Sequence, residues 1–292
     1  MSLFKFQPCN DNSKKALSNY SSWFSSPIKF NDPFEGLYEE SIKPVDNKGL
    51  IELVTALWNK NAFKTMCRGN GCETIDEYML KVFAFGRDDE LKTILVNIAK
   101  DILENQRRDF LKSGISCFIT KSDECDVISE PLMWGHYGDG LRGFALELDS
   151  AEMELWTNNP LIFRDDDVFS FKVEYREKPL ILNPVELMRM SCSGDASSKF
   201  DVGMILGSMM CSKSKKWKYE NEVRYINYHK QELLLRYREG SIRRIFIGDK
   251  MSDEDKVEML AIANEIGVKE IYEAYALKNE YKVAIRLISS SL

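Results

Sequence analysis

The chain is poor in histidine and has no excess of positive charge. Two of its 292 residues are histidine, His136 and His229, and its seven cysteines are scattered, with Cys67 and Cys72 as the closest pair. We therefore expect no Cys/His metal site and interpret the thiols as small buried hydrophobes in a reducing compartment. Lysine plus arginine number 40 against 46 acidic residues, a net charge of -6. This balance argues against non-specific nucleic-acid binding by the whole chain and leaves room for a local basic patch.

Long apolar runs are also missing. The N-terminal residues contain no cleavable apolar segment, and the most apolar later stretch, residues 202–211, is too short to span a bilayer. The proportions of hydrophobic residues (44%) and charged residues (29%) are ordinary for a globular protein and exclude wholesale disorder. We expect a soluble cytoplasmic protein with no membrane partner.

The order of hydrophobic patterns predicts a mixed α+β fold. Helical spacing fills residues 50–113, which we interpret as an all-helical insertion or lid of two or three helices within a single domain, residues 1–292. Thr74 and Glu77 have the spacing of a capping box within it. Strands are predicted at 3–6, 23–25, 115–119, 142–148, 169–175, 223–228, 242–247, 270–277 and 281–288, and helical segments at 14–20, 129–137, 184–213 and 252–266.

The first polar segment of interest is residues 23–35. A predicted strand delivers two hydroxyls to its end, and a turn rich in proline then carries an amide and two carboxylates between aromatic residues. The residues concerned are Ser25, Ser26, Asn31, Asp32 and Glu35. The simpler interpretation is a plain turn, because asparagine and aspartate before proline often bond their own backbone.

The second segment is residues 133–143, where glycines surround a histidine, a tyrosine and an arginine. Glycine allows a backbone to approach a ligand closely, and the forked guanidinium of Arg142 suits a phosphate or a carboxylate. His136 and Tyr137 lie in the same run. The alternative is a structural connection between a helix and a strand that starts at Arg142, with His136 forming an ordinary hydrogen bond.

The third segment is residues 213–226, in which four lysines precede a predicted strand. Each of Glu220, Glu222 and Arg224 is two residues from the next, so on a strand they would share one face. Neighbouring carboxylates are unfavourable unless a ligand or cation lies between them, and Arg224 is placed to neutralise Glu222. The alternative is an exposed strand edge whose charges neutralise one another.

Together these segments resemble a large, mostly bacterial family catalogued as a domain of unknown function. The resemblance rests on Leu-Phe-Lys-Phe at 3–6, Trp-Phe-Ser-Ser-Pro at 23–27, Phe-Asn-Asp-Pro-Phe-Glu at 30–35, Met-Trp-Gly-His-Tyr at 133–137 and Trp-Lys-Tyr-Glu-Asn-Glu-Val-Arg at 217–224. Some relatives are found among phage-defence and abortive-infection genes, so the resemblance implies a defence or toxin role. Ile119 departs from the small polar residue expected after Cys117-Phe118.

The layout is also similar to ADP-ribosyltransferases, which implies a largely antiparallel core and NAD as substrate. In that family a polar residue on the first strand, a serine motif ending the second and a Glu-x-Glu at a later strand surround the dinucleotide. Here Lys5 replaces the histidine or arginine often found on the first strand. The resemblance implies catalytic roles for Glu222, on the ribose and its developing charge, and for Glu220, on the acceptor. It assigns nucleotide binding to Lys5, Ser25, Ser26, Asn31, Asp32, Glu35, His136, Tyr137, Arg142 and Arg224.

Three functions therefore stay open. The first is an NAD-consuming ADP-ribosyltransferase or glycohydrolase with a protein or nucleic-acid acceptor. The second is a non-catalytic module that senses a nucleotide or a phage component. The third is a defence protein that acts on nucleic acid. It would bind a strand by the charge of the lysines of residues 213–218 and by stacking on Trp217 and Tyr219.

Overall fold

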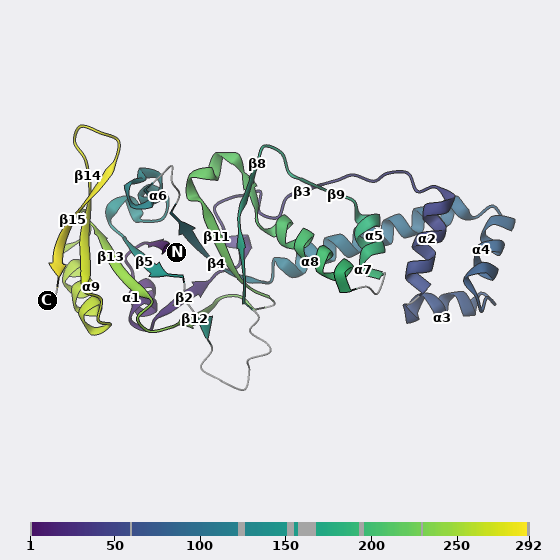
Figure 1. Ribbon diagram of the computed structural model, residues 1–292, viewed down its shortest axis with the longest axis horizontal. Helices are drawn as coiled ribbons and strands as arrows, with labels where there is room; N and C mark the ends of the chain where they lie inside the picture. Colours follow the sequence, from purple (N-terminus) through teal and green to yellow (C-terminus); the bar gives the residue numbers. More distant parts are fainter. Residues whose placement is uncertain are drawn as a thin grey trace. The chain divides into compact units, whose positions relative to one another are not determined.

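The computed structural model (Figure 1) describes residues 2–58, 60–121, 126–150, 155–156, 168–192, 196–228 and 230–290. The chain divides into two compact units. Unit 1 comprises Met1–Pro33, Lys112–Tyr175 and Ser214–Leu292, and unit 2 comprises Phe34–Leu111 and Arg176–Lys213. The predicted mixed α+β fold is confirmed, with a large and mostly antiparallel sheet.

Unit 1 is built on an eight-stranded sheet in the order β15-β14-β13-β5-β1-β4-β11-β7. Neighbouring strands are antiparallel except for β13 and β14. The strands are β1 (Ser2–Gln7), β4 (Gly114–Thr120), β5 (Phe144–Asp149), β7 (Val168–Lys172), β11 (Glu222–Asn227), β13 (Ile242–Gly248), β14 (Glu270–Ala276) and β15 (Val283–Ser290).

Both faces of this sheet are covered, because its central strands carry apolar side chains on both sides. Leu3, Phe118 and Leu146 belong to a core that includes residues of α9 (Asp253–Glu265). Phe4 and Phe6 belong to the opposite core, where the Phe6 ring meets Trp134 of α6 (Pro131–His136) edge-on at 5.1 Å. Burying one such side chain contributes about 1.5–3 kcal/mol. These two cores fix which face of β1, β4 and β11 each polar side chain occupies.

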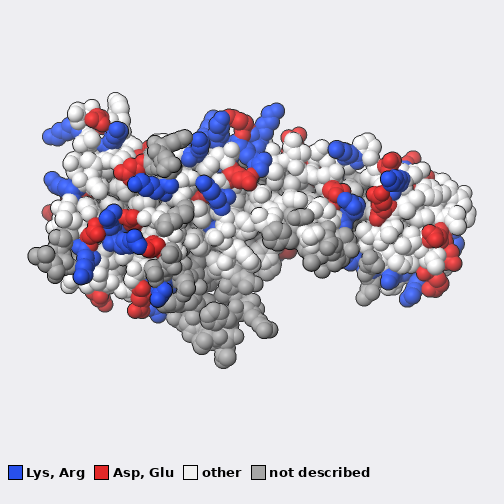
Figure 2. All heavy atoms as spheres, viewed as in Figure 1, with Lys and Arg blue, Asp and Glu red and all other residues white. Residues whose placement is uncertain are grey.

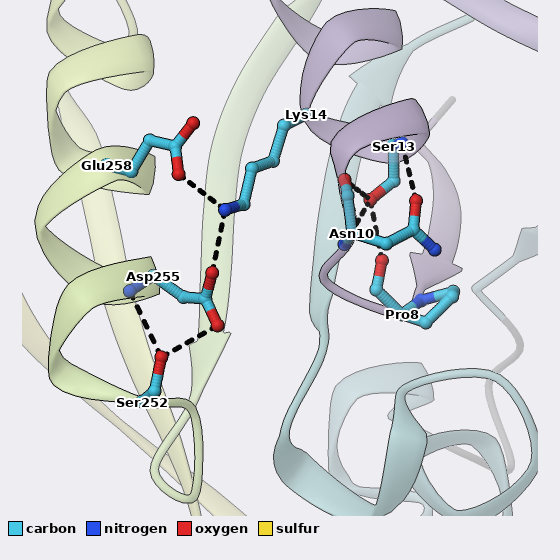
Figure 3. A network of polar contacts seen from close by, with 7 residues as sticks. All are labelled: Pro8, Asn10, Ser13, Lys14, Ser252, Asp255 and Glu258. Carbon is cyan, nitrogen blue, oxygen red and sulfur yellow. Dashed lines mark hydrogen bonds and ion pairs between the residues drawn. The ribbon is translucent and has the colours of Figure 1, made fainter.

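A charged contact joins α1 (Asp11–Ser18) to α9 in the same unit (Figure 3). Asn10 caps α1 in a reciprocal capping box with Ser13, and Ser252 caps α9. The ammonium of Lys14 lies between Asp255, at 2.7 Å, and Glu258, at 2.5 Å. We call these three side chains the α1–α9 charge cluster.

The remaining elements of unit 1 are short. A second sheet has the order β2-β12-β6, formed by β2 (Ser21–Phe24), β12 (Leu233–Tyr237) and β6 (Leu155–Trp156). The described residues of unit 1 also contain the 3₁₀ turns η1 (Pro27–Lys29), η2 (Val127–Ser129), η3 (Asp139–Leu141) and η4 (Lys215–Glu220). The short strands β8 (Glu174–Arg176) and β10 (Ser212–Ser214) include the residues at which the chain passes from one unit to the other.

Unit 2 is mainly helical and contains the predicted insertion. Its helices are α2 (Asn47–Trp58), α3 (Asn61–Gly69), α4 (Ile75–Ala84), α5 (Asp88–Phe110), α7 (Pro184–Cys192) and α8 (Ala196–Met210), and β3 (Tyr38–Glu40) pairs in parallel with β9 (Leu180–Leu182). The Thr74–Glu77 capping box is confirmed. Residues 50–113 hold four helices rather than two or three. Helix α7 packs along α5, so residues 176–213 belong to the helical unit, which extends beyond the predicted insertion of residues 50–113.

The structure confirms one predicted strand pairing and divides one predicted strand into two. The hairpin between the last two strands is confirmed, with Ala276 opposite Val283. The alternating run 169–175 is two strands, because pairing with β11 ends at Lys172 and Val173 is buried between β7 and β8. No helix in the described parts of the chain is both long enough and apolar enough to cross a membrane.

Candidate functional site

The first strand residue of β11 carries the carboxylate that the sequence singled out. Glu222 and Arg224 share a face, and the Arg224 Nε donates to Glu222 Oε1 at 2.8 Å. The exposed fractions of the two residues are 3% and 0%. The Arg224 guanidinium also lies 5.4 Å from the centroid of the Phe30 ring, and the Glu222 backbone N–H donates to the hydroxyl of Tyr175 at 2.8 Å. The predicted neutralisation of Glu222 by Arg224 is therefore confirmed.

The second carboxylate, Glu220, comes from a turn and not from the strand. It is the last residue of η4, and Asn221 adopts left-handed backbone with φ of 40°. The Asn221 amide donates to the Thr120 carbonyl at 2.8 Å, which holds the turn against the end of β4. The prediction that Glu220 lies on a strand face with Glu222 is wrong. The left-handed residue Asn221 between them interrupts the alternation of side chains that a continuous strand would have.

Tyr137, directly after α6, connects to this turn. Its hydroxyl donates to Glu220 Oε1 at 2.5 Å, and Glu220 itself is buried. Burial raises the pKa of the Tyr137 hydroxyl, and the charges of Glu220 and Glu222 raise it further. Tyr137 is thus a neutral hydrogen-bond donor at physiological pH. We call Tyr137, Glu220, Glu222 and Arg224 the central polar cluster.

Lys5 occupies the opposite face of the sheet from Glu222. Strands β1 and β4 pair at Leu3–Thr120 and Phe4–Ile119, and beyond that point the Lys5 Nζ donates to the Cys117 carbonyl at 3.1 Å. The same ammonium donates to the Ser116 hydroxyl at 2.9 Å and lies 4.6 Å from the centroid of the Phe118 ring.

The partners of Lys5 are neutral groups. Burial lowers its pKa from 10.5 to about 8, while Cys117 and Glu222 oppose that shift. The resemblance groups Lys5 with Glu222 around one ligand, whereas the strand register places the two residues on opposite faces of the sheet. The Glu222 charge still acts on the pKa of Lys5, because β4 is the one strand between β1 and β11 in the sheet.

The residues predicted between 23 and 35 lie in different local environments. Ser25 pairs through its backbone with Ile115, and the Ser26 N–H donates to Glu232 Oε1 at 2.9 Å. Asn31 is exposed and Asp32 is buried in unit 1, whereas Glu35 is buried in unit 2. Phe30 of this segment reaches the central polar cluster, where its ring contacts Arg224.

Arg142 is exposed, and its Nη1 donates to the Asp139 carbonyl at 3.4 Å. The prediction that it opens a strand is wrong, because Asp139, Gly140 and Leu141 all adopt positive φ and the strand begins at Phe144. At Gly143 a Cβ atom would lie 2.2 Å from the Gln7 carbonyl, so this glycine permits close packing against β1 rather than approach to a ligand.

His136 belongs to a row of rings that the sequence did not bring together. Its ring centroid lies 5.9 Å from that of Trp217 and 6.4 Å from that of Tyr219, and the last two are 6.1 Å apart. The signal that could have indicated this arrangement is the aromatic spacing at 217 and 219, directly before Glu220. Tyr175 gave no such signal, because its contact with Glu222 depends on strand pairing.

Within the ranges that the structure describes, no group of three or more His, Cys, Asp and Glu side chains is arranged to hold a metal ion. Cys67, Cys72, Cys192 and Cys211 are buried, as expected for small hydrophobic thiols. His229 and Cys125 lie outside the described residues.

Comparison with known proteins gives one family match. Residues 133–225 match the profile of a family described as a protein of unknown function (DUF2971). The whole central polar cluster and the rings of His136, Trp217 and Tyr219 fall within this stretch, whereas Lys5 does not. No curated protein and no solved structure matches the chain. The fold and site thus define an α+β protein with a buried, paired carboxylate cluster at the start of a sheet strand.

Proposed function

We propose that this protein consumes NAD as an ADP-ribosyltransferase or NAD glycohydrolase, with a role in phage defence. The observation that carries the proposal is the pair of carboxylates, Glu220 and Glu222, one on the turn and the other at the first residue of the strand that follows. Each has its own positioning partner, Tyr137 and Arg224 respectively. The order of polar segments in the sequence, which resembles that of ADP-ribosyltransferases, is consistent with the same reaction.

The chemistry follows from the charge that the reaction creates. When the bond between nicotinamide and the ribose C1′ breaks, its electron pair leaves with nicotinamide and neutralises the pyridinium. Positive charge develops on the ribose, and the Glu222 carboxylate stabilises it. An acceptor hydroxyl, amine or water then bonds to C1′ and gives its proton to Glu220.

Two neighbouring side chains keep these roles distinct. Arg224 holds the Glu222 carboxylate in one orientation, and the hydroxyl of Tyr137 orients Glu220 without carrying charge. Glu222 is almost inaccessible to solvent, so the proposal requires the η4 turn to move when the ribose enters.

The test measures nicotinamide release from NAD by the purified protein and two variants. Glu222→Gln keeps the shape of the side chain and removes its charge, so we expect turnover to fall by about 100-fold or more. Glu254→Gln, on the exposed surface of α9, is the matched control and should leave turnover unchanged. Equal turnover in wild type and Glu222→Gln, or none in either, would overturn the proposal.

A sensing module is the alternative outcome of the same experiment. Without turnover, a rise in melting temperature on adding NAD or ADP-ribose would indicate binding alone, because a ligand that binds the folded state stabilises it. Loss of that rise in Glu222→Gln would place the ligand at the central polar cluster.

A further inference from the structure

The turn that carries Glu220 also carries aromatic rings and exposed positive charge. Trp217 and Tyr219 lie on η4, and His136 at the end of α6 stacks on Tyr219 with an angle of 26° between the ring planes. We call these three rings the ring row. Its geometry falls in the range that aromatic pairs prefer, so the rings support one another as a fixed surface.

The ring row differs from the aromatic residues of the core. Trp134, one helical turn before Tyr137, is 1% exposed and its indole N–H donates to the Ile128 carbonyl at 2.8 Å. His136 is exposed, and Trp217 and Tyr219 are partly exposed. Rings that serve only the core are expected to be covered as Trp134 is, so the ring row offers aromatic surface to a ligand.

Positive charge is concentrated on the same six-residue turn. Lys215, Lys216 and Lys218 are all exposed. Figure 2 shows lysine and arginine side chains gathered over the region that Figure 1 labels β11. The chain as a whole has a net charge of -6, so this is a local basic surface on an acidic protein. The carboxylate of Glu220 is buried and bonded to Tyr137, which limits its repulsion of an incoming anion.

We infer that the ring row and these three lysines bind a single-stranded nucleic acid, which is the acceptor of the ADP-ribose. Unpaired bases stack on aromatic rings with little sequence preference, and lysines beside the rings contact the phosphates. A duplex hides its base faces, so single strands fit this surface better. This inference rests on the proposed function: a base nitrogen or oxygen bonds to C1′, nicotinamide leaves with the bonding electron pair, and the base proton passes to Glu220.

The test measures binding of fluorescent 12-nucleotide RNA and DNA single strands and of the DNA duplex, without NAD and over a range of salt concentrations. Trp217→Ala should weaken single-strand binding by about tenfold, the loss expected for one stacked base. Trp23→Ala is the matched control, because Trp23 is an exposed tryptophan on β2. Separate RNA and DNA arms identify the sugar that is preferred.

The charge contribution is tested with two triple variants. Replacing Lys215, Lys216 and Lys218 by glutamine should reduce the slope of log affinity against log salt by about 2. Replacing Lys15, Lys250 and Lys278, exposed lysines elsewhere in unit 1, should leave the slope unchanged. Thermal melting of every variant separates loss of binding from loss of folding.

The outcomes distinguish this inference from the proposed function. Nicotinamide release without single-strand binding, or binding that neither Trp217→Ala nor the first triple variant weakens, would overturn the inference and leave NAD cleavage standing. Binding without any nicotinamide release would support the surface and overturn its role as an acceptor site. Transfer of labelled ADP-ribose to the strand, lost in Trp217→Ala, would support both.

Discussion

Lys14 and Lys5, both in unit 1, have surroundings that shift their pKa values in opposite directions. In the α1–α9 charge cluster, Lys14 lies between two carboxylates, which raise its pKa by hydrogen bonding (Figure 3). Lys5 has a hydroxyl, a carbonyl and a ring as neighbours, and burial lowers its pKa to about 8. The first cluster compensates its charge and stabilises the contact between two helices. The surroundings of Lys5 leave its charge uncompensated, at a cost to stability. Such perturbed groups are characteristic of binding and catalytic sites.

The largest expected effect comes from removing the cation of the central polar cluster. Arg224→Met leaves Glu222 buried without its ion-pair partner, so we expect the free energy of unfolding to fall by about 3–5 kcal/mol. The double variant Glu222→Met with Arg224→Met should recover much of this loss. Urea denaturation measures both changes, and a single variant as stable as wild type would contradict the description of the pair as buried.

Tyr137→Phe tests the neutral donor of the same cluster. It removes the hydrogen bond to Glu220, a buried carboxylate, and we expect a loss of about 1–3 kcal/mol in unfolding free energy. Tyr281→Phe is a suitable control, because Tyr281 is fully exposed. Equal losses in the two variants would show that the Tyr137 hydroxyl contributes nothing specific.

The two lysines can be compared directly by the same substitution. Lys14→Met should cost about 1 kcal/mol, since Asp255 and Glu258 are partly exposed and regain water when the ammonium is lost. Lys5→Met should have no cost or should stabilise by up to about 1 kcal/mol, because it removes a desolvated charge that lacks a carboxylate partner. Chemical denaturation at pH 7 measures both; a larger loss for Lys5→Met than for Lys14→Met would reverse the comparison.

The smallest effect is the dependence of stability on pH. Lys5 has its pKa lowered from 10.5 to about 8, so between these values the folded protein binds fewer protons than the unfolded chain. Its contribution to unfolding free energy therefore rises with pH across that window. Lys14 has a raised pKa, so its contribution is present below 10.5 and is lost as pH rises further. Wild type and Lys5→Met are compared by denaturation from pH 7 to 10; parallel curves would contradict the shift at Lys5.

Local rules predicted the elements and the pairing of Glu222 with Arg224, because both depend on neighbours within a few residues. The capping box at Thr74, the final hairpin and the α+β class were accessible for the same reason. The rules failed at Asn221 and at Asp139–Leu141, where left-handed backbone interrupts a pattern that looks continuous. They also missed β12, which pairs with β2 from more than 200 residues away.

The amino-acid order alone determined which chemistry the chain can offer: carboxylates and an arginine at fixed spacing, lysines beside aromatic residues, and few metal ligands. Folding decided which of these groups share a face. Strand pairing placed Lys5 on the other face of the sheet from Glu222, and packing of α6 placed Tyr137 beside Glu220. The reason is physical: the contacts between distant segments are fixed by burial of their apolar neighbours, and that information lies in the two cores of the sheet rather than in any one stretch of sequence.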